Sequence, residues 1–492
     1  MSESVHGFPA ATRAGPPLFV DLDGTLIRTD VLYESAALAV RRSPAVLLQM
    51  PMWLMLGGRA RLKRELAGRT VDVFDPATLP YVPEVLAWLR EERSAGTHIV
   101  LATAGHRLLA EKVAAELGLF DAVLATDGEN LKGGRKLEAI RAYLRDRGLG
   151  EAFRYAGDSA ADRVLFAAAS GYVVVGGRRF SGLPTAPAAV LDRDRGGLRP
   201  LVRLLRPHQW TKNVLLLVPA VAGQKVLDPH VLAMSLVGVF VFSLLASATY
   251  IANDLLDMTA DRLHPRKRLR PLAQGLVSVP AAVGTAAALL AAAVLALLLT
   301  PVPFMLLAAV YLLAATAYST DLKRRVLVDV LCLAGLYTLR ILAGGAVTGI
   351  VVSPWLLAFS MFVFLSLAFV KRYTELTVTA GALGTGPEAM LAGRGYRPGD
   401  LDLLRSAGPA AGYVATLVLA LYVSAPEVSQ RYASPGYLYA LCPLALYWLT
   451  RVWFLAHRQQ LHDDPVVFAL RDRNSHIVLL LAVMVLLAAK FL

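Results

Sequence analysis

Three aspartates with helical spacing follow directly on a long uncharged segment of the chain. Residues 230–252 contain no Asp, Glu, Lys or Arg, and a run of that length indicates a membrane-spanning helix. Asp254, Asp257 and Asp261 are spaced i, i+3 and i+7, so a continuing helix carries all three carboxylates on one face. Carboxylates gathered at the mouth of such a helix repel each other unless a cation lies between them. Their hard oxygen atoms, with the side chain of Asn253, favour Mg²⁺ shared with substrate phosphates, so we predict a catalytic metal site here.

The sign of the charge reverses within one turn after these acids. A basic cluster suited to phosphate groups follows, formed by Arg262, Arg266, Lys267, Arg268 and Arg270. A positively charged cytoplasmic loop would explain the basic run alone. It does not explain an asparagine and three acids on one helix face in front of it. We therefore interpret the stretch as a site for a phosphorylated substrate, with Lys267 and Arg270 as candidate phosphate ligands.

The pattern NDxxDxxxD, from Asn253 to Asp261, resembles the first Asp-rich motif of the UbiA superfamily of intramembrane prenyltransferases. With DRLHPRKRLRPLAQG attached, the stretch looks more like one branch, the polyprenyl-phosphate (decaprenyl-phosphate) phosphoribosyltransferases. That resemblance implies a nine-helix membrane fold, Mg²⁺, the donor phosphoribosyl pyrophosphate (PRPP) and a polyprenyl phosphate acceptor.

A second pair of carboxylates follows a short apolar strand near the N-terminus. Residues 17–20 read PLFV, and Asp21 and Asp23 come next in the string DLDGT. Acids at i and i+2 after a strand lie at the carboxyl edge of an α/β sheet, where such sheets bind ligands. One carboxylate can attack phosphorus while the other transfers a proton to the leaving oxygen. Gly24 allows the tight turn.

Three further motifs occur in the order typical of haloacid dehalogenase (HAD) phosphatases, which DLDGT resembles. Thr103 ends a second apolar strand, Lys136 begins a predicted helix with Lys132 as its rival, and Asp158 and Asp162 form GDxxxD. The four motifs span residues 17–185 in the family's order.

The resemblance implies a role for each matched residue. Asp21 would be the nucleophile that forms an aspartyl-phosphate, and Asp23 the general acid and then the base. Mg²⁺ would bridge Asp21, Asp158 and the phosphate. Thr103 and Lys136 would hold phosphoryl oxygens, and Asp162 would support the site.

Composition divides the chain into a soluble part and a membrane part. Of 492 residues, 56% are hydrophobic and 18% charged, and the long apolar runs begin near residue 214. The formal net charge of +13 lies in loops between apolar runs, where membrane topology explains it, so no nucleic-acid partner is expected. The N-terminus shows no signal peptide, which predicts a cytoplasmic N-terminal domain. The two cysteines lie in apolar runs and indicate no disulfide framework.

The predicted domains are a Rossmann-like α/β HAD phosphatase over residues 1–185 with a small helical cap at about 30–80, a linker at 186–205, and an all-α membrane domain at 206–492. Within the cap, residues 44–56 (PAVLLQMPMWLML) are apolar and have basic flanks. This segment is either a buried cap helix or a helix lying on an anionic membrane surface.

Nine candidate spans make up the membrane domain: 212–224, 230–252, 279–299, 303–319, 328–347, 354–371, 411–425, 436–455 and 476–491. With a cytoplasmic N-terminus, the basic loops lie inside, as the positive-inside rule requires for an inner-membrane protein.

Every polar cluster of this domain falls on the predicted cytoplasmic face. The clusters comprise Lys212 and Asn213; Tyr318, Asp321, Lys323, Arg324, Arg325 and Asp329; Arg340; Lys371, Arg372, Tyr373, Thr374 and Glu375; His462, Asp463 and Asp464; and Arg471, Asp472 and Arg473. An ionisable residue inside a span, such as Arg340, is a functional candidate. The candidate phosphate ligands of this domain are Lys267 and Arg270 together with Lys212, Lys323, Arg340 and Lys371. We expect the acidic, metal-binding residues to lie opposite these cations.

One departure from the wider superfamily favours the phosphoribosyltransferase branch. Aromatic prenyltransferases commonly have a second motif with two acids four residues apart, whereas Asp321 and Asp329 are eight apart with three basic residues between them. The expected activity is transfer of phosphoribose from PRPP to polyprenyl phosphate and then removal of the 5-phosphate, which gives polyprenyl-phosphoryl ribose, a precursor of cell-wall arabinan. Two alternatives stay open: prenylation of a small or aromatic acceptor from prenyl diphosphate, and a HAD domain that is a silent regulatory module.

Overall fold

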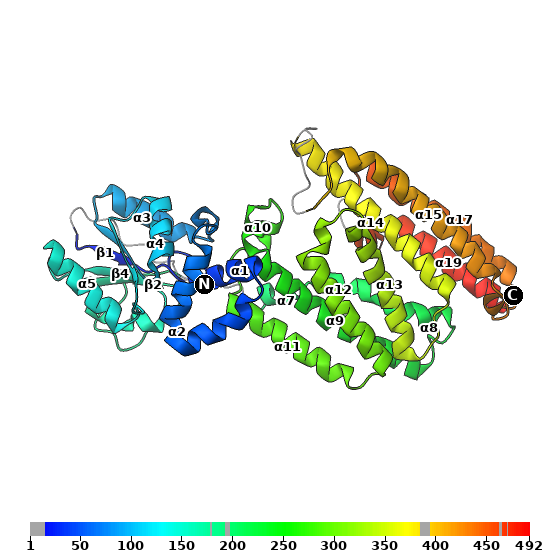
Figure 1. Ribbon diagram of the computed structural model, residues 1–492, viewed down its shortest axis with the longest axis horizontal. Helices are drawn as coiled ribbons and strands as arrows, with labels where there is room; N and C mark the ends of the chain where they lie inside the picture. Colours follow the sequence, from blue (N-terminus) through cyan, green and yellow to red (C-terminus); the bar gives the residue numbers. More distant parts are fainter. Residues whose placement is uncertain (1–14, 178–179, 192–196, 384–393, 462–464, 470) are drawn as a thin grey trace, which may run out of the picture. The chain divides into compact units, whose positions relative to one another are not determined.

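The computed structural model describes residues 15–177, 180–191, 197–383, 394–461, 465–469 and 471–492 (Figure 1). Two compact units are present, Met1–Leu205 with Ile251–Thr285, and Arg206–Tyr250 with Ala286–Leu492. The predicted polar group His462, Asp463 and Asp464 lies outside the described residues.

A six-stranded parallel sheet is the centre of the first unit, in the order β3-β2-β1-β4-β5-β6. Its strands are β1 (Leu18–Val20), β2 (Ile99–His106), β3 (Ala122–Thr126), β4 (Arg154–Gly157), β5 (Gly171–Val175) and β6 (Ala189–Leu191). Leu18 and Val20 pack into one buried apolar cluster and Phe19 into another, as expected for a strand covered on both faces. The parallel α/β domain predicted from the sequence is confirmed.

Helices on the two faces of the sheet supply these clusters (Figure 1). They are α3 (Pro83–Ser94), α4 (Arg107–Leu117), α5 (Gly134–Arg147) and α6 (Arg163–Ala168). Because β1 lies between β2 and β4 and all three run parallel, their carboxyl ends meet at one edge. This arrangement brings the motifs after β1 and β4 close to those in β2 and α5.

Two helices form a small cap between β1 and β2. They are α1 (Val31–Arg42), whose N-terminus is capped by the Asp30 side chain, and α2 (Val46–Thr70). Helix α2 is interrupted at Gly57 and Gly58, and Gly58 has φ of 61°. The cap has its own apolar core, made by Ala39, Val46, Trp53, Leu62 and Leu66.

Eight helices of the described chain are long and apolar enough to span a membrane. Six lie within α9 (Pro229–Leu256), α11 (Val279–Leu297), α12 (Val302–Thr320), α13 (Val328–Thr348), α14 (Pro354–Leu383) and α19 (Arg473–Phe491). The other two, Pro398–Ser424 and Pro435–His457, consist of α15 (Leu401–Ser424) and α17 (Leu441–His457), each with the 3₁₀-helix before it. Eight of the nine predicted spans therefore correspond to long helices. A multi-pass membrane protein follows from their number and composition.

The first predicted span, 212–224, is not a long α-helix, so the ninth predicted membrane helix is not confirmed among the described residues. The segment consists of the 3₁₀-helix η3 (Pro207–Leu217) and the short α8 (Val218–Ala222). It runs antiparallel to α9, because Trp210 Nε1 donates to Ser247 Oγ at 2.9 Å and Asn213 Nδ2 donates to Ser243 Oγ at 3.0 Å. A 3₁₀-helix rises roughly 2.0 Å per residue, so a count based on α-helix length misses such a segment.

A glycine on α13 allows η3 to approach closely. A Cβ atom at Gly344 would lie 2.1 Å from the backbone oxygen of Leu216. We expect Gly344→Ala to destabilise this unit by about 1–3 kcal/mol, because backbone atoms on both sides would have to move. Thermal unfolding of the detergent-solubilised protein measures this effect. The matched control is Gly335→Ala on the same helix, where a Cβ would meet nothing within 4 Å. Equal melting temperatures for the two variants would contradict the expectation.

Candidate functional site

The first candidate site lies where β1 ends. The Asp21 backbone N–H donates to Ala156 of β4 at 2.9 Å, which anchors the turn to the neighbouring strand. Gly24 has φ of 79°, and a Cβ there would lie 2.3 Å from Asp158 Oδ2. The glycine predicted for a tight turn is therefore also required by the approach of a carboxylate.

Lys136 joins three groups of the site. Its Nζ lies 3.0 Å from Asp21 Oδ1 and 3.8 Å from Asp162 Oδ1, and it donates to the Tyr155 hydroxyl at 3.1 Å. The rival candidate, Lys132, is exposed. The geometry therefore favours Lys136, at the start of α5, as the motif lysine. Tyr155 was not singled out from the sequence, because a tyrosine in a buried strand carries no motif.

Asp162 is held by its own neighbours. Tyr155 donates to its Oδ1 at 2.9 Å, and the Ser159 backbone N–H and hydroxyl donate to its Oδ2 at 3.0 and 2.6 Å. With both oxygens occupied, Asp162 orients Lys136 and Tyr155. This arrangement agrees with the supporting role that the sequence predicts.

Three carboxylates of this site can surround one cation. Asp21, Asp158 and Asp162 offer oxygens that lie within 4.8 Å of one another, the one such group in the described part of the chain. Since both Asp162 oxygens already accept hydrogen bonds, Asp21 and Asp158 fit best as direct ligands of a hard divalent ion. Thr103 lies on β2, fully buried, and its Oγ1 accepts from the Gly105 N–H at 2.9 Å.

The two aspartates of DLDGT have different proton affinities. Burial raises the pKa of Asp21 from its ordinary value of 3.8 to about 7, although Lys136 opposes the shift. Burial, with the neighbouring charge of Asp30, raises the pKa of Asp23 well above its ordinary range. For Lys136, burial lowers the pKa, but Asp21 and Asp162 outweigh it and raise the pKa overall. Both shifts favour the protonated form of a carboxyl group, and a raised pKa is typical of carboxyl groups that act as general acids.

A divalent cation must compete with a proton for Asp21. Because the pKa of Asp21 is about 7, the group is mostly protonated below that pH and ionised above it. We expect the Mg²⁺ concentration for half-maximal hydrolysis of p-nitrophenyl phosphate to fall about tenfold per pH unit between about pH 5.5 and 6.5, and to level off above about 7. Activity titrations at several pH values measure this. A midpoint independent of pH across that window would contradict the assignment.

Lys63 reaches the same site from the cap. Its Nζ donates to the backbone oxygen of Ala104 at 2.5 Å and to Asn130 Oδ1 at 2.7 Å. Burial lowers its pKa, while Asp23 and Asp30 pull in the other direction. In the sequence, Lys63 is only one of the basic residues that flank the apolar cap segment 44–56. It belongs to no motif, because only the folding of α2 over β2 brings it to this site.

The second candidate site surrounds the Asp-rich motif. Asp254 lies in the last turn of α9, Asp257 lies between α9 and α10 (Met258–Leu263), and Asp261 lies within α10. Arg270 Nη1 lies 3.1 Å from Asp254 Oδ1 and 2.5 Å from Asp261 Oδ2, so these two carboxylates face the same point. Both are buried, and burial raises the pKa of Asp261 even though Arg270 opposes the shift.

Arg270 thus contacts the acids, although the sequence suggested it as a phosphate ligand. The sequence predicts that a cation lies between these carboxylates, because they would otherwise repel each other. In the structure Arg270 contributes this positive charge. Asn253 and Asp257 are half-buried beside it, and Lys267 is exposed on η4 (Lys267–Leu269). Arg262, from the same basic run, forms a two-pronged ion pair with Glu34, at 3.0 and 2.7 Å, and does not serve as a free phosphate ligand. Among the described residues the acids of this motif do not form a three-carboxylate group like that of the first site, and Arg270 lies against two of them, so Mg²⁺ bound by this motif stays a prediction.

The third group of candidates surrounds Arg340 on α13. Its guanidinium donates to Asn213 Oδ1 at 2.9 Å, to the backbone oxygen of Leu336 at 2.6 Å and to the Tyr311 hydroxyl at 3.1 Å. All three acceptors are neutral, and among the described residues no carboxylate pairs with this buried arginine. Lys212 lies close by, 5.5 Å from the ring centre of Tyr337, which Arg340 also contacts. A buried positive charge among neutral acceptors makes this group a candidate binding site for an anion.

The two acids that could form a second metal motif, Asp321 and Asp329, have different surroundings and different partners. Asp329 is fully buried, pairs with the buried Arg372 at 2.5 Å and accepts from the Tyr396 hydroxyl at 2.6 Å. Asp321 is exposed and pairs with Arg325 at 2.8 Å. Their different partners agree with the departure noted in the sequence.

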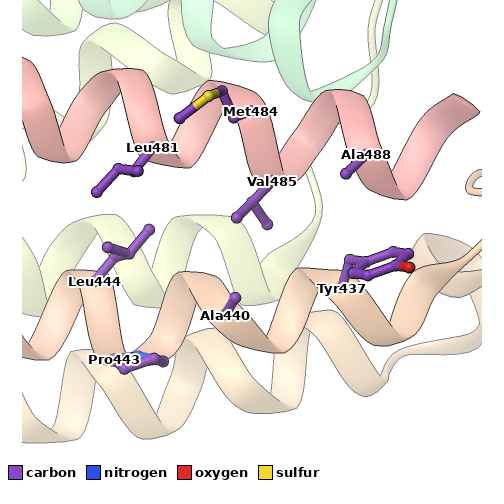
Figure 2. A pocket seen from close by; sticks show the side chains of 8 residues that line it. All are labelled: Tyr437, Ala440, Pro443, Leu444, Leu481, Met484, Val485 and Ala488. Atoms are coloured by element: carbon purple, nitrogen blue, oxygen red, sulfur yellow. The ribbon is translucent and has the colours of Figure 1, made fainter. Parts of the chain in front are cut away.

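Two further phosphate candidates lie elsewhere in the membrane domain. Lys323, in η5 (Leu322–Arg324), and Lys371, within α14, are both half-buried. Elsewhere, an apolar groove of about 460 Å³ lies between α19 and the segment formed by η7 (Pro435–Ala440) and α17 (Figure 2). Tyr437 is the one titratable residue of its lining, so the groove offers an apolar surface and no catalytic groups.

Comparisons with known proteins agree with the two kinds of site. A model of the UbiA prenyltransferase family matches residues 214–475, and a model of haloacid dehalogenase-like hydrolases matches residues 18–167. The uncharacterized protein y4nM of Sinorhizobium fredii is 40% identical over 468 residues, which cover 93% of this chain and 88% of that protein.

A partial relative and a solved structure are also similar. Decaprenyl-phosphate phosphoribosyltransferase of Mycobacterium tuberculosis is 41% identical over 182 residues, which cover 36% of this chain and 60% of that protein. The structure of a UbiA homologue from Archaeoglobus fulgidus bound to GPP and Mg²⁺ covers 60% of this chain and 100% of its own, with 18% identity and a TM-score of 0.46.

Proposed function

The chain belongs to the UbiA prenyltransferase family and carries a haloacid dehalogenase-like domain at its N-terminus, and on this premise we propose that it is a bifunctional enzyme of lipid-linked sugar synthesis. The membrane-domain chemistry transfers 5-phosphoribose from PRPP to the phosphate of a polyprenyl lipid. The HAD domain then removes the 5-phosphate, which leaves polyprenyl-phosphoryl ribose.

The buried, carboxylate-free Arg340 is the observation that carries the transfer proposal. Together with Lys212 it supplies two buried positive charges, which suit a substrate with more than one phosphate group. The partial similarity to a decaprenyl-phosphate phosphoribosyltransferase supports transfer of a phosphoribosyl group to a polyprenyl phosphate, and PRPP as the donor is part of this proposal. The separate partners of Asp321 and Asp329 disfavour a second metal motif for prenyl diphosphate.

In the transfer, the bond from ribose C1 to the pyrophosphate oxygen breaks, and an oxygen of the acceptor phosphate bonds to C1. Asp254, Asp257 and Asp261 would hold Mg²⁺, which supplies positive charge to the departing pyrophosphate. Arg270 lies against two of these carboxylates and would add positive charge for the departing pyrophosphate. Arg340 and Lys212 would be the cations that bind a further phosphate group.

In the hydrolysis, Asp21 attacks phosphorus and the bond to the ribose oxygen breaks. Lys136 and the Leu22 N–H both contact Asp21 Oδ1, at 3.0 and 2.9 Å, which fixes the direction of Oδ2. Asp23 gives its proton to the leaving oxygen and later takes one from the water that hydrolyses the aspartyl-phosphate. Asp21 and Asp158 would hold Mg²⁺, and Thr103 and Lys136 would hold phosphoryl oxygens.

Both reactions take place on the cytoplasmic face in this proposal. The basic loops support that side through the positive-inside rule. This topology requires residues 207–222 to cross the membrane, and the antiparallel contacts with α9 support a crossing. Eleven 3₁₀ residues and five α-helical residues extend about 30 Å if collinear, which matches the hydrocarbon thickness.

Thin-layer analysis of lipid products tests the proposal. Purified enzyme in vesicles receives Mg²⁺, PRPP labelled in the ribose ring, and polyprenyl phosphate. The expected product is a labelled lipid whose ribose carries no 5-phosphate. No labelled lipid, together with consumption of labelled prenyl diphosphate in a parallel reaction, would overturn the phosphoribosyl assignment. A labelled lipid that keeps its 5-phosphate would overturn the second step alone.

A further inference from the structure

The first half of α2 presents an apolar face to solvent. Val46 and Trp53 point into the cap core, whereas Leu48 is 84% and Met55 86% exposed. The exposed apolar side chains of this half are Leu47, Leu48, Met52, Leu54, Met55 and Leu56. Positions 48, 52 and 55 are spaced i, i+4 and i+7, so they form one continuous stripe. A contiguous patch of this kind on a soluble domain marks a surface that binds another apolar phase.

Arginines border this patch. Arg41, Arg59 and Arg64 are exposed, and in the described part of the chain they form no ion pair. An apolar stripe flanked by unpaired cations complements an anionic bilayer surface. It does not complement a second copy of itself, because a self-paired face would bring the arginines of two copies together. Residues 46–56 extend roughly 16 Å as a helix, too short to span a membrane but sufficient to lie on one.

The same helix connects this patch to the phosphatase site. After the interruption at Gly57 and Gly58, α2 continues to Lys63, which contacts Ala104 and Asn130 beside the catalytic loop. Asp23 and Asp30 lie close enough to Lys63 to shift its proton affinity. The two halves of α2 therefore carry the apolar patch and Lys63, which contacts residues next to the site, on one short stretch of the cap.

We propose that residues 46–56 are a membrane-contact surface that holds the cap on an anionic bilayer, so that the phosphatase site receives a phosphate monoester anchored in that bilayer. The identity of that substrate as a phosphoribosylated lipid rests on the proposed function, whereas the membrane contact does not. Lys63 is the specificity-determining residue that meets the anionic group of the anchored substrate as it enters.

Fluorescent labels on the full-length protein test the contact directly. Cys332 and Cys442 are the free cysteines, so Cys332→Ser with Cys442→Ser gives a background for one added cysteine. Met55→Cys and, as the control, Val164→Cys on the exposed face of α6 are labelled and reconstituted in phosphatidylglycerol-rich vesicles that contain a lipid-attached quencher. Quenching at position 55 but not at 164 is the expected result. Equal quenching at both positions, or none at 55, would overturn the membrane contact.

Activity on two substrates tests the consequence. The triple variant Leu48→Ser, Met52→Ser, Met55→Ser is compared with Val73→Ser, Leu108→Ser, Val164→Ser, which changes three exposed apolar residues elsewhere on the domain. The lipid substrate is the labelled lipid that an Asp21→Asn enzyme accumulates, presented in the same vesicles. The first triple variant should hydrolyse it at least about tenfold more slowly than the control, while both hydrolyse p-nitrophenyl phosphate at equal rates.

The outcomes separate this inference from the proposed function. Wild-type rates of lipid hydrolysis by the Leu48, Met52, Met55 variant would overturn the inference and leave the phosphatase assignment standing. Equal losses on the lipid and on p-nitrophenyl phosphate would also overturn it, because they would show damage to the fold. Failure of the wild-type enzyme to hydrolyse the lipid would overturn the proposed substrate, and the quenching result would still decide the contact.

Lys63→Met should raise the KM for the lipid with a smaller change in kcat. Lys63→Arg, which keeps the positive charge, should lower the KM part of the way back to the wild-type value.

Discussion

Asp21→Asn should stop the chain's reaction sequence at a phosphorylated lipid. The amide cannot attack phosphorus, and removal of a nucleophile in other covalent enzymes costs roughly 10⁴- to 10⁶-fold in kcat. Transfer of phosphoribose should continue at the wild-type rate. Thin-layer analysis of the lipid from labelled PRPP should therefore show only the species that keeps its 5-phosphate.

The fold should tolerate this change. The raised pKa of Asp21, about 7, shows that the folded protein does not favour the charged carboxylate, so replacing it with a neutral isostere costs little stability. Asp146→Asn, in an exposed position on α5, is the matched control and should leave both activities unchanged. A dephosphorylated product from Asp21→Asn at the wild-type rate would show that the HAD domain is a silent module.

Asp254→Asn should abolish formation of any labelled lipid. In the structure this buried carboxylate and Asp261 face the guanidinium of Arg270, the place that we assign to the metal-bound diphosphate. Removing a charged ligand from a metal that stabilises the leaving group costs several kcal/mol, or about 10²- to 10³-fold in rate. Hydrolysis of p-nitrophenyl phosphate by the same preparation should be unchanged, which also shows that the protein is folded.

Asp321→Asn is the control that separates the two donor chemistries. This residue is exposed and pairs with Arg325, so we expect transfer from PRPP to be unaffected. A loss of activity as large as that of Asp254→Asn would indicate a second metal motif and would favour prenyl diphosphate as the donor. Full transfer activity of Asp254→Asn itself would remove the Asp-rich motif from the mechanism.

The two aspartates of DLDGT both have raised pKa values but have different partners. Burial raises the pKa of each, Asp30 adds to the shift at Asp23, and Lys136 pairs with Asp21 and opposes the shift there. In the proposed reaction this difference in partners would favour Asp23 as the general acid and Asp21 as the nucleophile.

The amino-acid sequence by itself determined the parallel α/β domain, the long membrane helices and most residues of the first candidate site. Buried strands such as 18–20 are apolar runs, and the aspartates of this site follow β1 and β4 within a few residues. These are local relations between neighbours in the chain, so spacing and residue type are sufficient to find them. The helices of the membrane domain are likewise marked by their own length and composition.

The tertiary structure decided which residues meet when they are far apart in the chain. It selected Lys136 over Lys132, brought Lys63 from the cap to the site, and paired Arg270 with two acids. It also showed the first predicted span to be largely 3₁₀-helix, packed against α9 and close to Gly344.

The physical reason is that an ion pair or a close packing contact depends on the relative placement of two elements, which local spacing does not encode. A basic residue has the same local pattern whether it meets a carboxylate, a phosphate or water. Only the fold distinguishes Arg262, which is paired with Glu34, from Arg340, whose positive charge is buried among neutral acceptors.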